Sequence, residues 1–205
     1  MVTQRMFAFG PRVAAVLLLV IGLVTPWASG AAAGAGPRAG NFPNVRLRTQ
    51  DGRDVRFYDD LVKGKVVLIN FMFTSCTQLC PRGTENLAKA QQAFGEHAGR
   101  DVFFISISVD PARDTPAMLE QYAERFHARP GWVFVTGAAD DIGVIRRRLG
   151  VGDNDDKSQH SGMIIYGNDT TGSWASMPVT TNPATIASSV LRLLELPAHP
   201  RIAER

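Results

Sequence analysis

Apolar and polar residues alternate along the chain in blocks that predict strands and helices in turn. Nearly continuous runs of β-branched and aromatic residues predict three central strands buried on both faces, at 65–73, 102–109 and 131–135. Apolar residues at helical spacing predict three amphipathic helices, at 81–97, 115–127 and 140–149. Strands alternating with helices in this way indicate a parallel sheet covered by helices.

Shorter patterns flank these central elements. An Asp51-Gly52 turn between the segments 46–49 and 55–58 predicts an N-terminal β-hairpin. Later in the chain, two further strands joined by a turn and then a closing helix are predicted, at 162–166, 173–177 and 183–196. A hairpin followed by the order βαβαβαββα predicts an α/β fold, a thioredoxin-like sandwich with an N-terminal β-hairpin extension.

The N-terminal segment has the pattern of an export signal or a membrane anchor. Arg5 and Arg12 precede a 12-residue apolar core at 13–24, which is the length of a signal-peptide core. Small residues at 28–33 satisfy a cleavage rule, while the lack of charge between Arg12 and Arg38 equally admits an uncleaved single-pass anchor. Both alternatives predict an exported protein on the extracytoplasmic face, either anchored by its N-terminal helix or secreted after cleavage.

Composition limits the chain to one globular domain. Its 205 residues are 45% apolar and 20% charged, which excludes a wholly disordered chain. We predict a signal peptide or transmembrane anchor at 1–29, a flexible Gly/Ala-rich linker at 30–40 and a thioredoxin-like domain at 41–198. No cysteine lies near the candidate cleavage sites, so a bacterial lipoprotein anchor has no attachment point.

The charge pattern does not favour a nucleic-acid partner. The formal net charge is +3, the basic residues are scattered, and no motif combines basic and aromatic residues. The one dense basic run, Arg146-Arg147-Arg148, is predicted to line a solvated face of a helix. We therefore expect no nucleic-acid binding.

Cys76 and Cys80 are the only cysteines, and they lie between a predicted core strand and a predicted helix. Pro81 fits the first helical turn, which places Cys80 at the helix mouth and Cys76 on the connecting loop. The positive end of the helix, with Arg82 nearby, predicts thiolates at both positions, and thiolates attack disulfides and bind metals. The alternative is a structural disulfide, but closing a five-residue loop gives little stabilisation.

If the two cysteines bind a metal ion, the four histidines of the chain are the candidates for a third ligand. His97 and His127 end predicted helices and His199 lies in a Pro-rich tail, so we predict that none of the three is a ligand. His160 immediately precedes the strand expected to lie beside the strand that leads to Cys76. Position alone leaves His160 open between a metal ligand and a residue of a surface loop.

Three motifs together resemble the Sco/SenC family, the copper proteins of cytochrome oxidase assembly. They are the run Phe-Met-Phe-Thr-Ser-Cys-Thr-Gln-Leu-Cys-Pro at 71–81, the run Ser-Val-Asp-Pro-Ala-Arg-Asp-Thr-Pro at 108–116, and the histidine before a strand. The resemblance spans about residues 41–196. It implies that Cys76, Cys80 and His160 bind one copper ion on a thioredoxin-like fold, in a protein anchored to the membrane.

The resemblance also implies partners. The expected client is the subunit of cytochrome c oxidase that carries the CuA site, or another exported copper protein, and a donor chaperone would supply the copper. This chain departs from the family pattern at Thr77, where proline or an acidic residue is common, and at 168–172, where an Asp-Pro-x-Gly turn is common. Both departures leave the ligands intact and concern the surface that faces a partner.

The chemistry of the implied ligand set favours copper. Two thiolates and an imidazole form a soft three-coordinate set that suits Cu(I), with Cu(II) as a second oxidation state, whereas zinc prefers a fourth protein ligand. A disulfide between the cysteines would remove the site, so copper loading and thiol oxidation compete.

Three further residues of the chain have predicted roles. Asp110 is predicted either to orient a ligand or to be a turn residue. Met72 and Met163 are predicted to fill the core.

Other functions would use the same cysteines. The main alternative is an exported thiol-disulfide oxidoreductase, although three residues separate the cysteines and Ser161 stands where thioredoxins have a cis-proline. A peroxiredoxin-type peroxidase would have threonine where this chain has Phe73. A redox sensor that signals to a membrane partner is a further alternative. A copper carrier needs no turnover, so we expect enzyme activity only under the oxidoreductase alternative.

Overall fold

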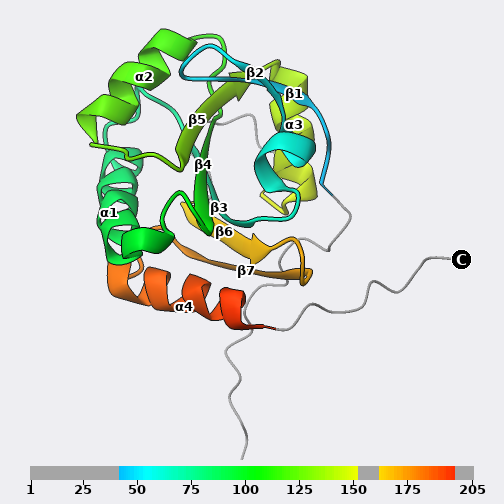
Figure 1. Ribbon diagram of the computed structural model, residues 1–205. Coiled ribbons are helices and arrows are strands. Elements are labelled where there is room, and N and C mark those ends of the chain that lie inside the picture. The colour runs from blue at the N-terminus through cyan, green and yellow to red at the C-terminus, as the bar shows by residue number, and fades with distance from the viewer. Residues whose placement is uncertain (1–41, 152–161, 197–205) are drawn as a thin grey trace, which may run out of the picture. The chain divides into compact units, whose positions relative to one another are not determined.

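Seven strands form one mixed sheet in the computed structural model, which describes residues 42–151 and 162–196 (Figure 1). The strands are β1 (Arg46–Thr49), β2 (Asp54–Arg56), β3 (Val66–Met72), β4 (Val102–Ser108), β5 (Trp132–Gly137), β6 (Met163–Asn168) and β7 (Ser173–Pro178). Their spatial order is β2-β1-β5-β4-β3-β6-β7. β3 pairs parallel with β4, and β4 with β5, while every other pair in the sheet is antiparallel. The predicted α/β class and order of elements are confirmed.

Helices cover both faces of the sheet (Figure 1). They are α1 (Leu79–Ala93), α2 (Pro116–Arg125), α3 (Ala139–Arg148) and α4 (Pro183–Glu195), with a π-helical turn η1 (Phe57–Val62) and a 3-10 turn η2 (Gly95–His97). α1, α2 and α4 pack on one face, and α3 and η1 pack on the other. Every residue of β3 is buried, and alternate side chains enter the two apolar cores, as predicted for a central strand.

Several predicted boundaries differ from the structure, and two of the differences have a clear local cause. The strand predicted at 55–58 ends at Arg56, because Phe57 turns into the core and the Arg56 N–H donates to Asp60 Oδ2 at 2.6 Å instead of extending the ladder. The helix predicted at 81–97 begins at Leu79 and ends at Ala93. Gly95 follows with φ +57°, a left-handed conformation that stops the helix and leads into η2.

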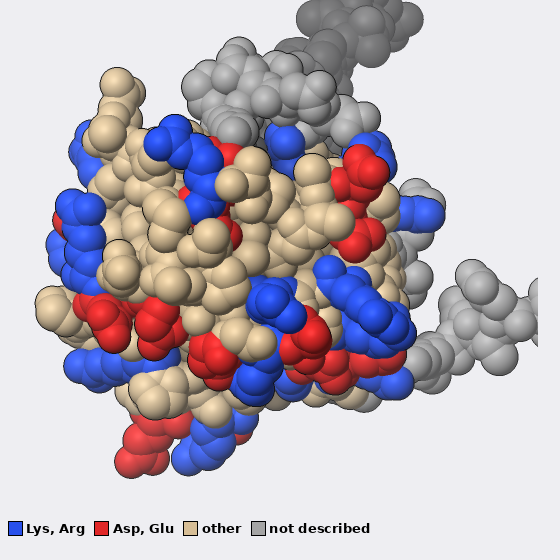
Figure 2. Space-filling view, turned by 90° about the horizontal axis from the view of Figure 1, so that it is seen from above, with Lys and Arg blue, Asp and Glu red and all other residues tan. Residues whose placement is uncertain are grey.

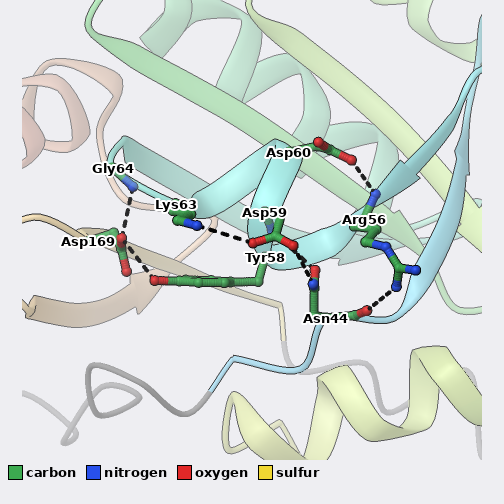
Figure 3. A network of polar contacts seen from close by, with 8 residues as sticks. All are labelled: Asn44, Arg56, Tyr58, Asp59, Asp60, Lys63, Gly64 and Asp169. Atoms are coloured by element: carbon green, nitrogen blue, oxygen red, sulfur yellow. Dashed lines mark hydrogen bonds and ion pairs between the residues drawn. The ribbon is translucent and has the colours of Figure 1, made fainter.

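Polar contacts fasten the segment before β3 to neighbouring parts of the chain (Figure 3). Asn44 and Asp59 exchange two hydrogen bonds, of 2.6 and 3.1 Å, which hold η1 to the residues before β1. On the other side, Asp169 at the end of β6 accepts from the Tyr58 hydroxyl at 3.3 Å and from the Gly64 N–H at 2.8 Å. These contacts lie at the start of β3, the end opposite to the cysteines.

The surface mixes charges of both signs. On the face seen in Figure 2, Lys and Arg lie next to Asp and Glu around the rim, and other residues fill much of the centre. Arg147 and Arg148 are exposed in the last turn of α3, where a positive charge is favourable, as predicted for a solvated helix face, whereas Arg146 is half-buried. Adjacent charges of opposite sign weaken any one-signed field over the face in view.

Helix length bears on membrane crossing. Within 42–151 and 162–196, the structure contains no helix that is both long enough and apolar enough to span a bilayer. The predicted signal peptide or anchor at 1–29 and the linker at 30–40 lie outside the described residues and stay predictions.

Candidate metal centre

The cysteines lie at the C-terminal end of β3. Cys76 is half-buried on the loop after the strand, and Cys80 is buried in the first turn of α1. Both are free thiols. β6 runs antiparallel to β3 with Asn70 opposite Ile164, so the start of β6 lies at the same end of the sheet. The predicted pairing of these two strands is confirmed, while His160 itself lies outside the described residues.

The loop brings the two sulfurs into contact. The Cys80 N–H donates to Cys76 Sγ at 3.3 Å, and the Cys76 N–H donates to the Phe73 carbonyl at 3.2 Å. Partial burial by itself raises the pKa of Cys76, but a hydrogen bond with the Cys80 thiol and the N–H groups of residues 78–80 outweigh it. The net effect is a lowered pKa, as predicted for a thiol at a helix N-terminus.

The pKa of Cys80 is raised, whereas a lowered value was predicted. Burial raises its pKa, the hydrogen bond with Cys76 raises it further, and the negative charges of Cys76 and Asp114 add to the effect. The prediction of thiolates at both positions is therefore wrong for Cys80, because loss of water outweighs the helix end. A metal ion that binds both sulfurs has to displace a firmly held proton from Cys80.

Asp114 is a buried carboxylate beside this loop that the sequence analysis did not single out. It accepts hydrogen bonds from the Thr74 N–H at 3.1 Å, from Thr74 Oγ1 at 2.5 Å and from Ser108 Oγ at 2.6 Å. It thereby ties the cysteine loop to the end of β4. Its signals in the sequence were its place in the motif at 108–116 and its position before the α2 N-cap, Thr115, whose side chain accepts from the Met118 N–H at 3.3 Å.

Asp110 is also buried, at the mouth of β4. Its N–H donates to Ser108 Oγ at 3.0 Å, and its carbonyl accepts from the N–H groups of Arg113 and Asp114 at 3.0 and 2.9 Å. The predicted role as a turn residue is therefore present in the structure. Its role in orienting a metal ligand stays a prediction.

Thr84 and Tyr122 form hydrogen bonds at the start of α1 that the sequence analysis did not predict. Thr84 Oγ1 donates to the Cys80 carbonyl at 2.8 Å and lies 3.0 Å from the Tyr122 hydroxyl. Burial raises the pKa of Tyr122. Met72 is fully buried, as predicted, whereas Met163 is half-buried and lines a small cavity beside Cys80.

Two of the remaining histidines lie in the described part of the chain, and their exclusion as metal ligands stays a prediction. His97 lies in η2 and its Nδ1 pairs with Asp101 Oδ2 at 2.7 Å, and His127 directly follows α2. His199 lies outside the described residues. Residues 42–151 and 162–196 contain no group of three or more His, Cys, Asp or Glu side chains placed to hold a metal ion. The described part of the candidate centre is thus the pair of thiols, a soft donor pair that suits Cu(I).

Comparison with known proteins gives one consistent result. The SCO1/SenC family model matches residues 40–195. A SCO2-like protein of Rickettsia felis is 33% identical over 106 residues, which is 49% of this chain and 50% of that protein. The chain spans about half the length of this and other curated relatives it matches.

Two solved structures are similar over nearly their whole length. One is a SCO1/SenC family lipoprotein from Bacillus anthracis, 27% identical with a TM-score of 0.65, covering 77% of this chain and 97% of that one. The other is copper-bound ScoI from Bradyrhizobium japonicum, 26% identical with a TM-score of 0.60, covering 79% of this chain and 99% of that one.

Proposed function

The chain belongs to the SCO1/SenC family, and from this membership we propose that it is a copper carrier whose ligands are Cys76, Cys80 and His160. It receives copper from a donor chaperone and delivers it to the CuA site of a cytochrome c oxidase subunit, or keeps the thiols of that site reduced. It works on the periplasmic side, held to the membrane by its N-terminal segment. No turnover is needed for this role.

The observation that carries the proposal is the meeting of two free thiols at one end of β3. The Cys80 N–H bonded to Cys76 Sγ shows that the loop already brings the first sulfur to the helix end. The start of β6, three positions after His160 in the sequence, lies at the same end of the sheet. Copper bound there would replace the thiol protons and be held by soft ligands that suit Cu(I).

Copper binding by the full-length chain tests the proposal. The reduced protein is loaded with Cu(I) without oxygen, and stoichiometry and affinity are measured against a chromophoric chelator. We expect one tightly held copper ion in the wild type. His160→Ala should weaken binding by more than about 100-fold, since loss of a mere outer-shell partner already costs about 10-fold to 100-fold. His127→Ala, at an exposed histidine after α2, is the matched control and should bind as the wild type.

The carrier function is rejected if the wild type does not bind Cu(I) tightly. It is also rejected if His160→Ala binds Cu(I) as tightly as the wild type. Oxidase assembly in cells is the second readout. If His160→Ala leaves the CuA-bearing subunit fully loaded, delivery to that site is rejected even where copper binding in vitro stands.

A second function, thiol-disulfide exchange, is favoured by the difference between the thiols. Cys76 has a lowered pKa and is half-buried, while Cys80 has a raised pKa and is buried, as in an attacking and a resolving pair. Cys76 thiolate would attack a substrate disulfide and release one thiolate. Cys80 would then give its proton to the released thiolate and attack the mixed disulfide at Cys76, which forms the Cys76–Cys80 disulfide and releases the second substrate thiolate. Reduction of a model disulfide by metal-free protein, lost in Cys76→Ser, would support this function over the carrier.

A further inference from the structure

A small cavity beside Cys80 has two polar side chains among its described lining residues, those of Asn70 and Cys80. The rest of its wall is apolar side chains and the glycines Gly83 and Gly162. The carbonyl of Gly162 is already paired, because it accepts from the Val179 N–H at 2.7 Å. The free volume is about 10 Å³, space for about one water molecule. The polar groups of Asn70 and Cys80 therefore face a shared, otherwise apolar space.

A chain of hydrogen bonds determines which way the Asn70 amide points. Trp132 Nε1 donates to Ser106 Oγ at 2.9 Å, and an indole nitrogen is a donor only. Ser106 therefore accepts from Trp132 and donates its single proton to Asn70 Oδ1, at 2.7 Å. An amide nitrogen cannot accept that proton, so the amide oxygen faces Ser106. The NH₂ group then faces away from Ser106.

This NH₂ group has no hydrogen-bond acceptor in the described part of the chain, and it is not fully closed off from a water-sized space. Asn70 is 7% exposed, and its only hydrogen bond there is the one that its oxygen accepts from Ser106. A buried donor left unpaired costs about 1–3 kcal/mol, so native structures almost always give it a partner. In the cavity that Asn70 lines, the Cys80 sulfur is the acceptor at hand.

We propose that Asn70 is a positioning residue for the thiol pair: its NH₂ group donates a hydrogen bond to one water molecule in the cavity, and that water molecule donates to the sulfur of Cys80. The bond stabilises negative charge on that sulfur, and therefore favours the reduced, metal-binding form over the disulfide. The predicted effect of Asn70 on copper binding rests on the proposed function. The predicted effect of Asn70 on the thiol-disulfide equilibrium does not depend on that function.

Substitutions of Asn70 in the full-length chain test the assignment. Asn70→Leu keeps the approximate volume and removes both donors. We expect Cu(I) binding about tenfold weaker and the equilibrium with glutathione shifted toward the Cys76–Cys80 disulfide by about threefold to tenfold, the worth of one hydrogen bond. Asn70→Asp keeps the acceptor for Ser106 but puts a carboxylate beside the sulfur. It should shift both quantities in the same direction and at least as far.

Two further variants separate positioning from folding. Ser106→Ala leaves the amide in place but frees it to turn, and should give a smaller shift of the same sign. Thr136→Val is the matched control, since Thr136 is a buried residue of β5 whose hydroxyl has no partner among the described residues. It should leave copper affinity and the thiol equilibrium at the wild-type values. Thermal unfolding is followed for all variants.

The outcomes are distinct. Shifts in Asn70→Leu and Ser106→Ala beyond those of Thr136→Val support the assignment. If Asn70→Leu lowers only the unfolding temperature, with copper affinity and thiol equilibrium as in the control, Asn70 is structural and the assignment is overturned. If the wild type binds no copper but the thiol equilibrium still shifts in Asn70→Leu, the carrier function fails and the hydrogen bond to Cys80 stands.

Discussion

Two buried aspartates fasten the two ends of β3, and their surroundings differ. At the start of the strand, Asp169 accepts from the Tyr58 hydroxyl and the Gly64 N–H (Figure 3). At the other end, Asp114 accepts from the backbone and hydroxyl of Thr74 and from the hydroxyl of Ser108. Both use a carboxylate to hold a loop to the sheet.

The difference lies in what stands next to each carboxylate. The negative charge of Asp114 contributes to the raised pKa of Cys80, after burial and the hydrogen bond with Cys76. The contacts of Asp169 are with a glycine N–H and a tyrosine hydroxyl, and neither cysteine is among them. The same device is thus purely structural at one end and also acts on the thiols at the other. The following predictions test that contrast.

The largest effect is expected when either carboxylate is removed. Asp114→Ala leaves one N–H and two hydroxyls without their acceptor and should cost about 3 kcal/mol of unfolding free energy, and Asp169→Ala about 2 kcal/mol. Urea unfolding measures both. Asp54→Ala, whose side chain is 74% exposed, is the control and should change little. Equal losses in all three variants would contradict the buried role of Asp114 and Asp169.

A smaller loss is expected from Thr84→Val, which keeps the shape of the side chain. The Cys80 carbonyl and the Tyr122 hydroxyl each lose a partner, so unfolding free energy should fall by about 1.5 kcal/mol. Urea unfolding is again the measurement. Thr185→Val, at an exposed position of α4, should be close to neutral. A Thr84→Val protein as stable as this control would show that the hydrogen bonds under the cysteine helix contribute nothing net.

Neutralising the carboxylates without removing their shape sharpens the contrast. Asp114→Asn removes a negative charge near Cys80, so the thiolate becomes less unfavourable and the pKa of Cys80 should fall. Asp169→Asn should leave it unchanged. Alkylation of each cysteine is followed against pH by mass spectrometry, and Cys76, with its lowered pKa, should react at lower pH than Cys80 in every variant. Identical Cys80 titrations in both variants would remove Asp114 from the electrostatics of the site.

The smallest effect is expected on the surface of the Asp169 end. Lys63 pairs with Asp59 at 3.5 Å, four residues apart, and both side chains are largely exposed. Lys63→Ala should therefore change the unfolding free energy by less than about 0.5 kcal/mol, and added salt should reduce even that. A loss comparable to that of Asp169→Ala would mean that the network in Figure 3 is held by its surface charges.

Local patterns were enough to predict most of the fold. The buried run of β3, the Asp51-Gly52 turn and the proline at the start of α2 depend on neighbours in the chain, and each element formed where it was expected. The end of β2 was missed because Phe57 is drawn into a core made by distant segments. The pairing of β1 with β5 was likewise absent from the prediction.

Some features of the candidate site could likewise be predicted from local sequence, and others could not. The Cys76–Cys80 spacing before a helix identified the thiols from the sequence, and the lowered pKa of Cys76 followed from the helix end. The raised pKa of Cys80 could not be predicted from the sequence, because it is caused mainly by burial, and burial depends on packing by distant segments. His160 as a ligand stays a prediction.

Sequence alone determined which segments become strands and helices, and that two thiols stand at a strand-to-helix turn, because hydrophobic periodicity and turn residues act over a few positions. Tertiary structure decided that Asp114 reaches the cysteine loop and that Asn70 meets Ser106. These contacts arise from the parallel register of β3 and β4, which sets Asn70 opposite Ser106 and Met72 opposite Ser108. Register is settled by packing the two faces of the sheet against distant helices, and no neighbour in the chain encodes it.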